Sequence, residues 1–132
     1  KDLGQVIDVL NSTIKLPFVD GDRIYVGGLS MGGMGTWELL WRLPNTFAAA
    51  IPICGGGLES KAAMMAHIPI WAFHGSADDV VGLKYSQQMV DALYLNGGKP
   101  KFTVYPGVGH VSWTPSFAEK DFLKWIFDQR KD

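Results

Sequence analysis

The spacing of apolar residues along this chain predicts helices and strands in alternation. Leu3, Val6, Ile7 and Leu10 recur every three to four residues and predict an amphipathic helix that ends near Pro17. Short apolar runs predict four strands at residues 23–26, 47–53, 70–73 and 101–105. The first of these runs is rich in β-branched and aromatic residues, and we expect it to be buried on both faces.

The segments between the predicted strands carry helical signals. Apolar residues follow the first strand at helical spacing as far as Pro44, and Trp37 and Trp41 of this helix are expected to be core residues. A short helix is expected near residues 60–66. A longer helix is expected over residues 83–95, where an Asn-Gly-Gly sequence provides a favourable C-cap.

A capping signal predicts the last helix. Ser116 and Glu119 have the spacing of a capping box. The inward-facing residues of this helix would be Ala118, Phe122, Trp125 and Ile126. Strands that alternate with helices predict an α/β fold with about four parallel strands, joined by right-handed crossovers in one domain over residues 1–132.

Composition narrows the choice of partners. The chain has 132 residues, of which 47% are apolar and 19% charged, as is typical of globular domains. Its net charge of −1 and its lack of a basic block give no reason to expect nucleic acid or an anionic membrane as a partner. No apolar run is long enough to span a bilayer.

A G-x-S-x-G pentapeptide, Gly28-Leu29-Ser30-Met31-Gly32, lies between the first predicted strand and the helix that follows it. A serine on a sharp strand-to-helix turn is lifted above the sheet, and such a turn tolerates strain only where flanking residues lack side chains. Gly28 and Gly32 meet that need. The pattern and its context therefore predict that Ser30 is a nucleophile.

An acid and a base follow the serine in chain order. Asp78 lies in the polar loop after the strand at 70–73, and His110 lies in a glycine-rich turn after the strand at 101–105. The carboxyl ends of parallel strands meet at one edge of a sheet, so both side chains are expected on the same side as Ser30. Asp79 competes for the role of the acid, and spacing alone does not decide between the two aspartates.

These motifs, Gly28-Leu29-Ser30-Met31-Gly32-Gly33, His74-Gly75-x-x-Asp78 and Tyr105-x-Gly107-x-Gly109-His110, resemble the α/β-hydrolase superfamily over nearly the whole chain. The chain is most similar to bacterial carboxylesterases and predicted peptidases related to dienelactone hydrolases and feruloyl esterases. The resemblance favours a secreted bacterial protein, whose signal is expected in the N-terminal part that this sequence lacks. The resemblance implies Ser30 as nucleophile, Asp78 as acid and His110 as base, and it favours Asp78 over Asp79.

The resemblance also implies how the oxyanion is bound. One donor would be the backbone N–H of Met31, the residue after the nucleophile, at the start of a helix. The second donor comes from a loop in the family's N-terminal half, which has no counterpart in this sequence. The chain thus resembles the C-terminal half of the fold, without a large cap. We expect the N-terminal half as a companion, either a separate chain or a segment lost by cleavage; a self-sufficient minimal hydrolase is the alternative.

Residues near the predicted triad suggest a substrate pocket. Val80 and Val81 follow the acid and would form an apolar wall, although packing explains them equally well. Trp113, three residues after His110, would line the same pocket. The short segment between the strands at 47–53 and 70–73 leaves no room for a large cap, which favours small ester substrates.

The remaining histidines and the single cysteine are expected to be structural. His74 ends a strand and is expected to be a hydrogen-bonded structural residue, His67 is expected at the surface, and Cys54 is expected to be packed at a strand end. Their spacing is not typical of metal ligands, so we expect no metal site, and the resemblance implies no cofactor.

The pattern and the resemblance together predict a serine carboxylesterase that acts on short-chain or aryl esters through an acyl-enzyme. A serine peptidase of the prolyl-oligopeptidase type shares the same motifs and remains an alternative. A non-catalytic hydrolase-fold module, for binding a ligand or a partner, is the second alternative.

Overall fold

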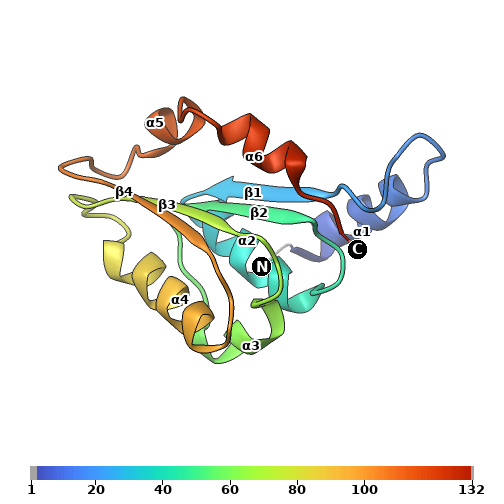
Figure 1. Cartoon of the computed structure of the whole chain (residues 1–132), viewed down its shortest axis with the longest axis horizontal. Helices are drawn as coiled ribbons and strands as arrows, with labels where there is room; N and C mark the ends of the chain where they lie inside the picture. The colour runs from blue at the N-terminus through green and yellow to red at the C-terminus, as the bar shows by residue number, and fades with distance from the viewer. Residues whose placement is uncertain (1–2, 132) are drawn as a thin grey trace.

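The computed structural model describes residues 3–131, which form one parallel sheet with helices on both faces (Figure 1). The strands are β1 (Tyr25–Leu29), β2 (Ala49–Ile53), β3 (Trp71–Gly75) and β4 (Lys101–Tyr105), in that spatial order. The helices are α1 (Leu3–Ile14), α2 (Met31–Arg42), the 3₁₀ turn η1 (Glu59–Lys61), α3 (Ala62–Met65), α4 (Leu83–Leu95), α5 (Trp113–Phe117) and α6 (Phe122–Asp128). All three strand pairs are parallel. The predicted α/β class and its four parallel strands are confirmed.

Two apolar clusters hold the helices to opposite faces of the sheet. Figure 1 shows α5 and α6 over one face and α2, α3 and α4 over the other. The larger cluster lies between the sheet and α2 to α4, and partly buried residues of α1 pack against it. The smaller cluster lies between the sheet and α6. The core is therefore divided by the sheet into two layers.

Strands β2 and β3 serve both layers because successive side chains point to opposite faces. Ile51 and Phe73 belong to the cluster under α6, whereas Ala50 and Ala72 belong to the cluster under α2 to α4. Every residue of these two strands is buried. Burial on both faces explains why the two segments read as continuous apolar runs in the sequence.

The predicted helix over residues 83–95 and strand over 101–105 match α4 and β4 in full. The expectation that the first strand is buried on both faces is wrong. Strand β1 is half-buried, and Leu29 at its end is exposed, because β1 lies at the edge of the described sheet with β2 as its one partner there. Within residues 3–131, no helix combines the length and apolar character needed to cross a bilayer.

The predicted capping box of the last helix is wrong. Ser116 lies inside α5, and its hydroxyl donates to the carbonyl of Ser112 at 2.7 Å. Glu119 instead accepts a hydrogen bond of 2.6 Å from the hydroxyl of Tyr105 on β4. The Glu119 carboxylate is therefore bound to Tyr105 and does not cap a helix. The chain forms two short helices, α5 and α6, in place of the one predicted.

The burial of the predicted inward face follows from this break. Phe122 and Ile126 of α6 are buried as expected, and Trp125 is partly buried against the same cluster. Ala118 is exposed because it lies at the end of α5, outside the face that meets the sheet. Residue Asp121, with a φ of 71°, separates the two helices.

Candidate active site

Ser30 lies at the turn where β1 ends and α2 begins. Its backbone dihedrals are φ 56° and ψ −117°, a conformation that residues with side chains rarely adopt. Two hydrogen bonds hold it there: the Ser30 N–H donates to the carbonyl of Ile53 at 2.9 Å, and the Met34 N–H donates to the carbonyl of Ser30 at 3.0 Å. The strain expected of a nucleophile turn is therefore present and is supported by the neighbouring strand β2.

Close backbone contacts require two glycines around this turn. A Cβ on Gly28 would collide with the backbone of Gly32, and a Cβ on Gly33 would lie 2.6 Å from the carbonyl oxygen of Ile53. A Cβ on Gly32 would meet no described atom within 4 Å. The prediction that Gly32 must lack a side chain is therefore wrong, because Gly33, and not Gly32, faces β2.

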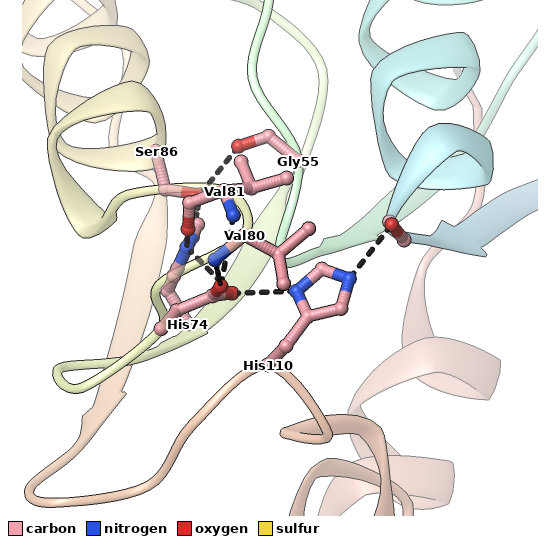
Figure 2. A network of polar contacts seen from close by, with 8 residues as sticks. Gly55, His74, Val80, Val81, Ser86 and His110 are labelled. Atoms are coloured by element: carbon pink, nitrogen blue, oxygen red, sulfur yellow. Dashed lines mark hydrogen bonds and ion pairs between the residues drawn. The ribbon is translucent and has the colours of Figure 1, made fainter.

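The structure brings together the three side chains that the sequence singled out. The Nε2 atom of His110 lies 2.8 Å from the hydroxyl oxygen of Ser30, and its Nδ1 atom lies 2.8 Å from Oδ2 of Asp78. Figure 2 shows the His110 ring with one dashed contact at each nitrogen. Because an ionised carboxylate only accepts hydrogen bonds, Nδ1 carries the proton and Nε2 is free to accept one from the serine.

Asp78 is held by its own loop. Its Oδ1 atom accepts hydrogen bonds from the backbone N–H groups of Val80 at 2.9 Å and Val81 at 2.8 Å. Its side chain is fully buried. Burial opposes ionisation, but the hydrogen bonds from His110, Val81 and Val80 outweigh it and hold the pKa of Asp78 below its ordinary value. Asp79, the competing aspartate, is exposed.

The loops after β3 and β4 contact each other and place the acid beside the base. The N–H of Ala77 donates to the carbonyl of Val108 at 2.9 Å, and the N–H of Gly107 donates to the hydroxyl of Ser76 at 2.8 Å. A Cβ on Gly75 would collide with the carbonyl of Val108. Glycine at this position therefore permits the close approach of the two loops.

A cavity of about 470 Å³ is lined by residues of α2, the loop after β2, the loop that follows Asp78, and α4, but not by Ser30, Asp78 or His110 themselves. Val80 and Val81, which the sequence analysis placed in the wall of a substrate pocket, line this cavity. The other lining residues are Met34, Glu38 and Trp41 of α2, Gly56, Gly57 and Leu58 of the loop after β2, and Tyr85 of α4. Trp113 is not among them; its ring meets the ring of His110 edge-on, with centroids 5.7 Å apart.

The sequence did not predict most of the residues that line this cavity. Trp37 is buried in the core as expected, but Trp41 is partly exposed and lines the cavity. Met34, Glu38 and Trp41 recur at helical spacing after Ser30, a signal that places them on one side of α2. Nothing in the sequence indicated that this side meets the loop after β2.

Cys54 lies beneath the triad, at the end of β2, with a φ of 46°. Burial raises the pKa of its thiol, although the N–H of Ser30 and the hydroxyl of Ser112 partly oppose this effect. Ligand atoms of Cys54, Asp78 and His110 lie within 4.8 Å of one another, a grouping that their spacing in the sequence did not predict. These atoms could hold a soft metal ion, but Asp78 and His110 are already hydrogen-bonded to each other.

The other two histidines lie outside the triad. His67 is exposed, as expected, and its Nε2 atom lies 2.7 Å from the carbonyl oxygen of Pro44. His74 is completely buried, and both of its ring nitrogens have hydrogen-bond partners, as expected of a structural residue. Its ring lies within the polar network of Figure 2.

The fold and the site define a class of protein, the α/β-hydrolases that carry a serine at a strand-to-helix turn. Residues 1–126 match the phospholipase/carboxylesterase family. The chain belongs to this family, and the resemblance of its sequence to carboxylesterases of the α/β-hydrolase superfamily is confirmed.

Three of the known proteins similar to this chain are esterases or thioesterases by name. It is 39% identical to a thermostable esterase of known structure, with a TM-score of 0.94, over 98% of this chain and 37% of the other. It is 34% identical to acyl-protein thioesterase 1 of Neurospora crassa, over 80% of this chain and 46% of that protein. It is 33% identical to the bifunctional acetylxylan esterase/xylanase XynS20E of Neocallimastix patriciarum, over 66% of this chain and 13% of that protein. The chain thus spans less than half the length of these relatives.

Proposed function

We propose that this chain carries the nucleophile, the base and the acid of a serine carboxylic-ester hydrolase. The observation that carries the proposal is the continuous hydrogen-bonded series from Ser30 through His110 to Asp78, with both bonds at 2.8 Å. A serine hydroxyl is a weak nucleophile at neutral pH, and an adjacent imidazole oriented by a buried carboxylate is the arrangement that activates it.

The proposed reaction has two halves. In the first, Nε2 of His110 takes the Ser30 proton while Oγ attacks the ester carbonyl, and the imidazolium then gives that proton to the leaving alcohol. In the second, His110 takes a proton from water, which attacks the acyl-enzyme and releases the acid, and the proton returns to Ser30. Asp78 holds the His110 tautomer and stabilises the imidazolium in both halves.

Met31 is proposed to bind the oxyanion through its backbone N–H. It is the first residue of α2, and the N–H groups of a helix's first turn have no acceptor within the helix. The positive end of the helix dipole adds to the attraction for a developing negative charge. The N–H of Ser30 is not available for this role because it donates to Ile53.

A companion segment is proposed to pair with β1 and to supply a second oxyanion donor. An unpaired strand edge is a site for pairing with a further strand, and Leu29 and Met31 expose apolar surface beside it. A groove of about 480 Å³ between α1, α2 and β1 lies next to this edge.

We expect residues 1–132 expressed alone to associate or precipitate. A soluble 14.5 kDa monomer in size-exclusion chromatography would contradict the companion.

Short-chain or aryl esters are the proposed substrates. Two of the residues that line the cavity, Val80 and Met34, lie within four residues of Asp78 and Ser30 in the chain, and the walls are mainly apolar, which suits an acyl or aryl group. Between β2 and β3 the structure has η1 and α3 and no large insertion that would cover the site. Two of the similar proteins are an acetylxylan esterase and an acyl-protein thioesterase by name, which supports an acyl-transfer reaction.

The test is hydrolysis of para-nitrophenyl acetate and its longer acyl homologues by the full-length protein, which is this chain together with its companion segment. A Ser30→Ala variant is assayed beside it. We expect activity that falls with acyl length and disappears in the variant. Activity on an acyl-prolyl or aminopeptidase substrate, without activity on aryl esters, would replace the esterase proposal with a serine peptidase. A folded protein without either activity would favour a non-catalytic module.

A further inference from the structure

A second imidazole lies beneath the triad and contacts its acid. His74, at the end of β3, is completely buried, and Figure 2 shows it between the loop of Val80 and Val81 and the helix residue Ser86. Its Nδ1 atom lies 2.7 Å from the hydroxyl oxygen of Ser86, and its Nε2 atom lies 2.6 Å from the carbonyl oxygen of Val81. The same Nε2 atom is 3.3 Å from Oδ2 of Asp78.

The partners of His74 determine where its proton lies. A backbone carbonyl oxygen can only accept a hydrogen bond, so Nε2 of His74 carries the hydrogen that Val81 accepts. That hydrogen is directed at the Val81 carbonyl, and Oδ2 of Asp78 lies 3.3 Å from the same nitrogen without forming a hydrogen bond to it. The side of the ring that faces the triad is therefore a donor.

His74 thereby acts on both oxygens of the Asp78 carboxylate. Oδ2 of Asp78 accepts the hydrogen bond from Nδ1 of His110, and Nε2 of His74 lies close to the same oxygen. Oδ1 accepts the N–H groups of Val80 and Val81, which belong to the loop that His74 holds through the Val81 carbonyl. Loss of the Nε2 donor would free this loop and, with it, two of the hydrogen bonds that orient the acid.

The far side of the ring connects this loop to the nucleophile helix. With the ring hydrogen at Nε2, Nδ1 of His74 accepts the Ser86 hydroxyl hydrogen, and the Ser86 oxygen packs against the carbonyl oxygen of Gly55 at 3.2 Å. Gly55 in turn packs against Gly33, because a Cβ on Gly55 would lie 2.6 Å from the Gly33 carbonyl carbon. One buried imidazole thus joins the acid loop, α4 and the segment that abuts α2.

We propose that His74 is a positioning residue for the acid of the triad. Its Nε2–H holds the Val81 carbonyl and faces Asp78, and this keeps the carboxylate in the orientation that fixes the His110 tautomer. The inference rests on the proposed function, because it assumes that the His110 tautomer matters for hydrolysis. It assigns His74 no direct contact with the reacting atoms.

The test compares three variants in the full-length protein. His74→Leu removes the donor at nearly constant volume, and His74→Gln keeps an N–H donor near the position of Nε2. Leu93→Ala, a buried residue of α4 without contact to the acid, serves as the control for lost stability. For para-nitrophenyl acetate we expect kcat of His74→Leu to fall about 10- to 100-fold with little change in KM, since small misplacements of catalytic groups cost this much.

The Leu93→Ala control and the His74→Gln variant distinguish a positioning role of His74 from an effect on stability alone. Leu93→Ala, assayed well below its own melting temperature, should keep kcat within about twofold of the parent, and His74→Gln should recover most of the activity. Equal kcat values for His74→Leu and Leu93→Ala would overturn the proposal. If His74→Leu does not fold, His74→Asn replaces it, because the Asn amide is too short to reach Val81; equal activity of the Asn and Gln variants would also overturn it.

A spectroscopic readout keeps the inference separate from the proposed function. The proton between Nδ1 of His110 and Asp78 gives a low-field NMR signal that does not require turnover. We expect this signal to shift or broaden in His74→Leu, and to persist in His74→Gln and Leu93→Ala. An unchanged signal in His74→Leu would overturn the positioning role. If the protein is inactive on all esters but shows these changes in the NMR signal, the proposed function is refuted and the positioning role of His74 is not.

Discussion

The backbone N–H of Ser30 donates to the carbonyl oxygen of Ile53 at 2.9 Å, so the proposed nucleophile is tied to the neighbouring strand through its own main chain. This bond supports the positive φ of Ser30, which costs free energy in a residue with a side chain. It also directs the oxyanion role to the next residue, Met31. The same carbonyl of Ile53 lies against Gly33, so strand β2 shapes both sides of the turn.

The two glycines of the pentapeptide should respond differently to substitution. Gly28→Ala places a Cβ against the backbone of Gly32 and should lower the free energy of unfolding by about 1–3 kcal/mol or more, with loss of activity. Gly32→Ala is the matched control, because its Cβ has open space and alanine favours helix α2. Urea unfolding and ester hydrolysis would measure both. Equal destabilisation by the two substitutions would contradict the steric argument.

Replacing the acid by its amide should nearly abolish hydrolysis without unfolding the protein. In Asp78→Asn the amide oxygen can still accept from Val80 and Val81, but the amide nitrogen would then face Nδ1 of His110 and favour the wrong tautomer. By analogy with other serine hydrolases we expect kcat to fall about 10³- to 10⁴-fold. Asp79→Asn, at an exposed position, is the control and should keep normal rates.

Asp78 should also make stability depend on pH in the acid range. Its pKa is lower in the folded protein than in the unfolded chain, so its contribution is fully present above the unfolded value of about 4. That contribution is lost as the pH falls through the folded value. Urea unfolding across this range should show the difference in free energy between the parent and Asp78→Asn shrinking as the pH falls. A difference independent of pH would show that the pKa of Asp78 is not lowered.

The thiol of Cys54 should be unreactive in the folded protein. It has no exposed surface, and burial raises its pKa, so little thiolate forms near neutral pH. A colorimetric thiol reagent should therefore report no reaction until guanidinium unfolds the chain. Rapid labelling of the native protein, with loss of esterase activity, would contradict this expectation.

A larger residue in the cavity wall should shorten the range of acyl chains accepted. Met34 lines the cavity one helical turn after Ser30 and also lines the groove beside β1, and Met34→Trp would fill part of the cavity. We expect KM for para-nitrophenyl butyrate to rise about tenfold or more and KM for the acetate to change little, since lost apolar burial costs about 1–3 kcal/mol. Met64→Trp, at an exposed site on α3, is the control. A parallel loss on both esters would place the acyl group elsewhere.

Local signals in the sequence were sufficient for much of the fold. The helix at Leu83–Leu95 and the strand at Lys101–Tyr105 each combine a clear period with a clear stop, and both have the predicted bounds. Ser30, Asp78 and His110 could be selected together because each follows a strand, and the carboxyl ends of parallel strands share one edge of a sheet. These predictions depend on short-range periodicity and on chain order, which a sequence records directly.

Tertiary contacts decided the rest, because they join residues whose separation in the chain carries no pattern. The carboxylate of Glu119 accepts a hydrogen bond from Tyr105 of β4, and Asp121, with a positive φ, separates α5 from α6. The carbonyl of Ile53 makes Gly33, and not Gly32, the glycine that the turn requires. His74 looked like an ordinary buried histidine until β3 and its loop brought it to Asp78. The sequence by itself determined which groups reach the carboxyl edge of the sheet, whereas packing between strands and loops determined how each group is held there.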